Sequence, residues 1–69
     1  MRALKPAEIK QARDGLGMSQ AEFANAFHLS VRTLQKWEIG GMKPSGATAV
    51  LLWLISRIPN QILKALRDS

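Results

Sequence analysis

Two helix-capping serines stand close together near the middle of the chain, and they constrain the fold more than any other feature. Ser19 begins an S-x-x-E sequence with Glu22, the capping box in which each side chain satisfies a free backbone N–H of the other residue. Ser30 is the next candidate for an N-cap. The chain is therefore expected to form two short helices, at about 19–27 and 30–38, joined by a tight turn.

Glycine and proline residues divide the remainder of the chain into further segments. Apolar residues recur at a spacing of three to four in these segments, and none alternates as a half-buried strand does. The expected fold class is all-α, with five short helices in a single domain over residues 1–69 and the two-helix motif at about 19–38. The other helices are expected from Pro6 to about Gly15, from about Ala47 to Arg57, and from Pro59 onward.

The fourth segment contains the most apolar run of the chain, from Ala49 to Ile55. Residue propensity would allow a strand here, but a strand would have no partner in an otherwise helical chain. A helix that is apolar on every side must be covered on every side, so one face is expected to meet a second copy of the chain. We therefore predict a homodimer with Leu52, Trp53 and Ser56 at its interface, although Trp53 could belong to the core of one chain instead.

Composition excludes several classes of function. The chain has no cysteine and one histidine, so no metal or other cofactor is expected, and its five scattered carboxylates do not indicate an enzyme. No apolar run approaches the roughly 20 residues that cross a bilayer, and no secretory signal is present, so a cytoplasmic protein is expected. The net charge of +5 favours a polyanionic partner without identifying it.

The second helix of the motif has one apolar and one polar face. Leu34 and Trp37 are expected to point inward, which at about 100° per residue places Val31, Arg32, Gln35 and Lys36 together on the outside. This is either a solvated surface or a helix for the major groove of DNA, where Arg pairs with guanine and Gln with adenine. The residues expected to contact phosphates are Ser19, Gln20, Thr33 and Lys43.

The run from Leu16 to Gly40, LGMSQAEFANAFHLSVRTLQKWEIG, resembles the lambda-repressor-like helix-turn-helix domains of the Cro/C1 or XRE group. The matching features are SQAEFA at the start of the first motif helix, the capping Ser30, and the WE-x-G ending. Downstream, KPSGATAVLLWLI and IPNQILKAL are similar to small antitoxins of the HigA and MqsA type, which repress their own operons and whose partners are RNA-cleaving toxins.

The resemblance implies specific contacts. It implies a phosphate contact by Gln20, base contacts from the outer face of the second motif helix, and an ion pair between Arg13 and Glu38. Two positions depart from the family pattern. His28 stands where glycine is usual, at a turn position that requires positive φ, and Ile39 stands where a polar residue commonly contacts the DNA backbone.

The expected function is sequence-specific binding of double-stranded DNA by a dimeric repressor, an antitoxin that regulates its own toxin–antitoxin operon from a near-palindromic operator. One alternative is a protein-interaction module that mainly neutralises a toxin, with DNA binding secondary. Another is a phage-type or plasmid-type repressor unrelated to any toxin. A membrane partner is not expected, because the most apolar helix has no charge before Arg57.

Overall fold

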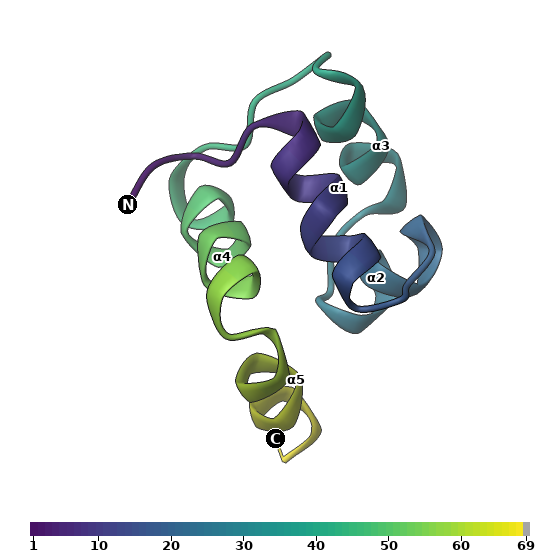
Figure 1. The fold of residues 1–69 in the computed structure, drawn as a ribbon, viewed down its shortest axis with the longest axis vertical. Coiled ribbons are helices and arrows are strands. Elements are labelled where there is room, and N and C mark those ends of the chain that lie inside the picture. The colour runs from purple at the N-terminus through teal and green to yellow at the C-terminus, as the bar shows by residue number, and fades with distance from the viewer. Residues whose placement is uncertain (69) are drawn as a thin grey trace.

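The computed structural model describes residues 1–68 and shows five α-helices (Figure 1). They are α1 (Pro6–Gly15), α2 (Gln20–Ala26), α3 (Val31–Ile39), α4 (Gly46–Arg57) and α5 (Pro59–Arg67). No strand occurs among the described residues, so the expected all-α fold is confirmed.

The two motif helices begin at the predicted serine caps. Ser19 Oγ accepts a hydrogen bond from the backbone N–H of Glu22 at 3.1 Å, and the Glu22 carboxylate accepts one from the backbone N–H of Ser19 at 2.8 Å. Ser30 Oγ accepts a hydrogen bond from the backbone N–H of Thr33 at 3.4 Å. Each motif helix is thus started by a side chain that satisfies one of its otherwise unpaired N–H groups.

The turn between α2 and α3 depends on a residue in the left-handed region. His28 has a φ of 59° and is the only non-glycine residue with positive φ in residues 1–68. Immediately after it, the N–H of Leu29 donates to the carbonyl of Ala24 at 2.8 Å, which closes the turn. The predicted conformation of His28 is therefore confirmed, and the turn carries the strain that a Cβ adds at such a position.

The core lies where four of the helices meet. α3 packs against both α1 and α2, α4 packs against α1, and α5 packs against α4 (Figure 1). Leu34 is completely buried, and Trp37 is 5% exposed, as expected for the inner face of α3. The largest fully buried side chains are Phe23, Ile9, Leu34, Leu52 and Ile55. Burying one side chain of this kind contributes about 1.5–3 kcal/mol to folding, so these residues fix the orientation of α3.

α4 is buried on one face only. Leu52 is 1% exposed within a single chain, so the prediction that it lies at a dimer interface is wrong: the core of its own domain already covers it. The exposed apolar residues of this region follow the opposite side of the helix at intervals of four. They are Val50, Leu54 and Ile58, at 45%, 40% and 40% exposure. We call these three residues the α4 stripe.

α4 and α5 meet at a sharp bend. Pro59 occupies the first position of α5, where its missing N–H costs no hydrogen bond. Among the described residues, no single helix is long and apolar enough to cross a bilayer, and α4 with α5 would qualify only as a pair bent by 110°.

Candidate nucleic-acid interface

The outer surface of α3 presents the four residues predicted to contact bases. Val31, Arg32, Gln35 and Lys36 are all exposed, and we call them the α3 face. Because positions i, i+1, i+4 and i+5 share one side of a helix, their side chains form a single surface. The buried Leu34 holds this surface outward from the opposite side of the helix.

A buried ion pair determines the charge of α3. Arg13 of α1 donates through Nε and Nη2 to the two carboxylate oxygens of Glu38, each at 2.9 Å, so the pair implied by the resemblance is present. The side chains of Arg13 and Glu38 are only 12% and 5% exposed. A hydrogen bond from Arg13 holds the pKa of Glu38 below its usual range. Glu38 is the only carboxylate of α3, and it is paired with Arg13. The charged side chains on the outer surface of the helix are therefore all cations.

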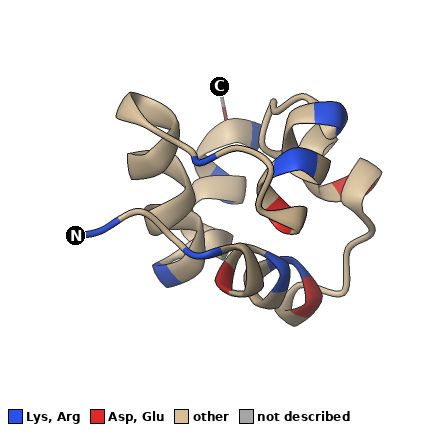
Figure 2. Cartoon of the chain, turned by 90° about the horizontal axis from the view of Figure 1, so that it is seen from above, with Lys and Arg blue, Asp and Glu red and all other residues tan. Residues whose placement is uncertain are grey.

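The two cationic side chains of the α3 face have no partner among the described residues. No hydrogen bond or ion pair engages the side chain of Arg32 or Lys36 in residues 1–68, in contrast to Arg2 and Arg13, which each bind a carboxylate. Figure 2 shows that Lys and Arg are spread over several helices, so net charge alone does not locate an interface. Exposed unpaired cations also lie on α5, at Lys64 and Arg67, so what distinguishes the α3 face is that its charges lie on the second helix of the α2–α3 motif.

The predicted phosphate-contacting residues occupy different environments. The backbone N–H of Ser19 is not available to a phosphate, because the Glu22 carboxylate accepts its hydrogen bond. Gln20 is half-buried and bonded to neighbouring side chains of α3. Thr33 is half-buried on α3, whereas Lys43 is exposed in the loop before α4. The predicted groups therefore surround α3, but they do not offer equally free hydrogen-bond donors.

Ile39 is the most exposed large apolar residue, at 81%. It ends α3 beside the glycine cap, where the family usually has a polar residue. Its side chain cannot donate a hydrogen bond to DNA, which agrees with the departure noted in the sequence.

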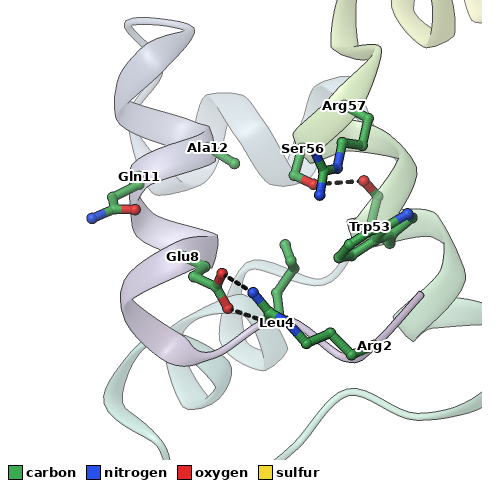
Figure 3. A pocket seen from close by; sticks show the side chains of 8 residues that line it. All are labelled: Arg2, Leu4, Glu8, Gln11, Ala12, Trp53, Ser56 and Arg57. Carbon is green, nitrogen blue, oxygen red and sulfur yellow. Dashed lines mark hydrogen bonds and ion pairs between the residues drawn. The ribbon is translucent and has the colours of Figure 1, made fainter.

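Trp53 faces a second part of the surface, a hollow of about 310 Å³ between the N-terminal segment, α1 and α4 (Figure 3). The guanidinium of Arg57 lies 4.4 Å from the centre of its ring, and that of Arg2 lies 5.9 Å away. Arg2 is in turn bound by both carboxylate oxygens of Glu8 (Figure 3). Trp53 is thus half-buried beneath two cations and does not belong to the α4 stripe, while Ser56 donates its hydroxyl to the carbonyl of Trp53 at 2.6 Å.

Two features of the structure could not be predicted from the sequence, one beside the α3 face and one on α4. One is the hydrogen bond between Gln20 and Gln35, which are 15 positions apart and carry no shared sequence signal. The other is the identity of the exposed side of α4. A helix that is apolar all round gives no periodic signal to show which side is buried. The polar Ser56 and Arg57 could have shown only that their own side of α4 lies outside the core.

Comparison with known proteins agrees with this geometry. A family model described as helix-turn-helix matches residues 9–52, a span that includes most of α1, all of α2 and α3, and α4 as far as Leu52. The chain belongs to the XRE-type helix-turn-helix family. The resemblance drawn from the SQAEFA and WE-x-G sequences is therefore confirmed.

Three relatives show how far the similarity extends. The chain is 39% identical over 59 residues to Antitoxin HigA-2 of Vibrio cholerae, covering 86% of this chain and 57% of the antitoxin. It is 38% identical over 52 residues to the HTH-type transcriptional regulator YiaG of Escherichia coli K12, covering 75% of this chain and 54% of the regulator. It is also 50% identical over 44 residues to the Type II methyltransferase M.SsoII of Shigella sonnei, covering 59% of this chain but 12% of the enzyme.

The chain thus spans little more than half the length of the antitoxin and of the regulator. The methyltransferase match is confined to a short segment of that enzyme and gives no reason to assign methyl transfer to this chain.

Proposed function

We propose that this helix-turn-helix protein binds double-stranded DNA with the α3 face in the major groove and regulates transcription from that site. The observation that carries the proposal is the grouping of unpaired Arg32 and Lys36 with an amide, on a helix whose one carboxylate is bound by Arg13. A helix about 10–12 Å wide fits the major groove, and this surface meets the polyanion with no opposing charge.

Each residue of the α3 face has a role suited to its chemistry. Arg32 donates two hydrogen bonds to O6 and N7 of guanine, and Lys36 donates to guanine or to a phosphate. Val31 contacts the methyl group of thymine. The contacts to the DNA backbone come from the Ser19 hydroxyl, the second amide hydrogen of Gln20, Thr33 and Lys43, and they fix the register without selecting the sequence.

A second copy of the chain covers the α4 stripe in this proposal. Val50, Leu54 and Ile58 are apolar and exposed in the single chain, and burying them removes apolar surface from water. Two copies related by a two-fold axis would place their α3 helices in successive major grooves about 34 Å apart. The corresponding operator is a near-palindrome, and occupation of it excludes RNA polymerase.

The similarity to HigA-2 supports a narrower proposal, that the protein is an antitoxin which represses its own operon in the cytoplasm and binds an RNA-cleaving toxin. The similarity to YiaG supports the alternative of a regulator without a toxin. Co-expression of the protein with the product of an adjacent gene separates them: relief of that product's toxicity and co-purification support the antitoxin, and continued toxicity supports the other.

The DNA-binding proposal is tested by replacing one cation on the α3 face and one elsewhere. Arg32→Ala is expected to weaken binding to a selected duplex by about 1–3 kcal/mol and to relax the preference at one base position. Arg67→Ala, which removes an exposed arginine of α5, is the matched control and is expected to change binding little. Titrations at two salt concentrations should also show affinity falling steeply with salt. Equal binding of selected and random DNA by the unaltered protein and by Arg32→Ala would contradict the proposal.

A further inference from the structure

A chain of hydrogen bonds runs from α1 through α2 to the α3 face. Arg13 binds the carboxylate of Glu38, and Oε1 of that carboxylate also accepts a hydrogen bond from Nε2 of Gln20 at 3.3 Å. Oε1 of Gln20 then accepts a hydrogen bond from Nε2 of Gln35 at 3.4 Å. One exposed amide of the α3 face is therefore connected to the buried ion pair.

The carboxylate determines the direction of every bond in this chain. An ionised Glu38 can only accept hydrogen bonds, so Gln20 must turn its NH₂ group toward it. The carbonyl oxygen of Gln20 then faces Gln35, which must in turn present its own NH₂ group to Gln20. Gln35 is left with its carbonyl oxygen and one amide hydrogen for an external partner.

We infer that Gln20 is a positioning residue which orients the amide of Gln35, so that the base contacted by Gln35 is adenine. Adenine offers the N6 amino group to the carbonyl oxygen and N7 to the remaining amide hydrogen. Each of the other bases pairs with only one of these two groups: cytosine offers its N4 amino group to the carbonyl oxygen, and guanine and thymine offer acceptors to the amide hydrogen. This inference rests on the proposed insertion of α3 into the major groove.

The experiment selects binding sites from duplexes with randomised positions, using the unaltered protein, three single variants and one double variant. Gln35→Ala identifies the base position that Gln35 contacts, because preference is lost there. Gln20→Met keeps the length of the side chain but removes both hydrogen bonds. Gln11→Met, at an exposed position of α1 that lines the hollow beside Trp53 and not the α3 face, is the matched control (Figure 3).

The expected result is specific to one base position. The unaltered protein and Gln11→Met should favour adenine there over guanine by about tenfold, in keeping with the usual cost of a mismatched base pair. In Gln20→Met that ratio should fall below about twofold, since the amide of Gln35 is free to turn, while preferences at other positions stay unchanged. In the double variant Gln20→Met/Gln35→Ala, the loss of Gln20 should add nothing at this position.

Two outcomes would overturn the inference while leaving DNA binding intact: a preference for any base other than adenine at this position, or an unchanged preference in Gln20→Met. The hydrogen bond itself is tested without DNA, by NMR of the side-chain amide of Gln35. Its resonances should shift in Gln20→Met and not in Gln11→Met. If the resonances of the Gln35 amide shift in Gln20→Met but the unaltered protein selects no DNA sequence, both the proposed function and the assignment of adenine are rejected. No shift would reject the positioning role directly.

Discussion

The α2–α3 pair and the α4–α5 pair differ in how their helices are capped and in which residues they leave exposed. In the first pair, both helices have serine caps with hydrogen bonds, and the exposed residues are mostly polar, with Val31 and Ile39 as the large apolar exceptions. In the second pair, neither helix has a side-chain cap, and three large apolar residues lie exposed in the α4 stripe. The exposed apolar residues of the second pair follow one side of α4, whereas Val31 and Ile39 of the first pair lie at opposite ends of α3.

This contrast indicates what each region does. A capped helix anchored by buried residues holds its exposed side chains in a fixed arrangement, as sequence-specific contacts require. An exposed apolar stripe has no such directionality, but its burial stabilises association with a matching surface. The contrast supports the proposals that the α3 face contacts DNA and that a second copy of the chain covers the α4 stripe.

The largest difference should appear when one leucine from each region is shortened. Leu34→Ala removes a completely buried side chain and is expected to cost about 2–5 kcal/mol of unfolding free energy, because it leaves a cavity beneath the α3 face. Leu54→Ala should cost about 1 kcal/mol or less in the monomer, because the side chain is already partly in water. Urea unfolding at low protein concentration measures both values, and similar losses would show that the two regions do not differ as described.

The buried ion pair should make stability depend on pH through α3. Glu38→Gln is expected to cost about 3 kcal/mol near pH 7, because it leaves the guanidinium of Arg13 without its charged partner. The pKa of Glu38 is lowered in the folded protein from about 4.5, so its stabilisation is present above pH 4.5 and is lost as the pH falls through the folded value. In Glu38→Gln this part of the acid-induced loss should disappear.

Asp14→Asn provides the control for this measurement. The Asp14 carboxylate also approaches Arg13, at 3.6 Å, but its side chain is 57% exposed, so its removal should affect stability far less. Unfolding measured between pH 3 and pH 7 compares the variants. If Glu38→Gln kept the full pH dependence of the unaltered protein, the assignment of that dependence to the ion pair would be wrong.

A carboxylate placed on the α4 stripe should act on association. Leu54→Glu is expected to weaken dimer formation by about tenfold or more, because a two-fold interface would bring two unpaired carboxylates out of water. Ile39→Glu, which alters an exposed isoleucine outside the stripe, should leave dimerisation unchanged. Sedimentation over a range of concentrations distinguishes these results, and a stable dimer in Leu54→Glu would place the interface elsewhere.

The smallest predicted effect compares two serines at equivalent positions. Ser19→Ala should cost about 1 kcal/mol, because it removes an observed cap from α2. Ser45→Ala should cost much less, since the side chain of Ser45 makes no cap hydrogen bond at the start of α4. Thermal unfolding of the two variants tests this difference. Equal losses of stability would show that the two serines contribute equally to their helices.

Most of the motif could be predicted from the sequence, because its determinants are local. The Ser19 cap depends on a residue three positions away, and the inward direction of Leu34 and Trp37 follows from helical spacing. The positive φ of His28 was implied by the family resemblance, because glycine is usual at this position of the turn. These signals operate within one or two helical turns, so they are present before any tertiary contact forms.

The remaining features depend on contacts between distant parts of the chain. The sequence of α4 contains apolar residues on every side, so it does not distinguish the buried Leu52 from the exposed Leu54. That difference arises from the packing of α4 against α1. The bonds among Gln20, Gln35 and Glu38 join side chains from two helices, and their direction depends on a carboxylate that Arg13 holds from a third.

The most direct test of the account is an NMR titration of the protein with its selected duplex, following backbone amides and the side-chain groups of Arg32 and Gln35. We predict that the largest changes fall on the α3 face, with smaller changes at Gln20 and Lys43 and none at the exposed residues of the hollow beside Trp53. Large changes confined to α1, α4 or α5, with the resonances of Arg32, Gln35 and Lys36 unmoved, would contradict the central claim that the outer surface of α3 contacts DNA.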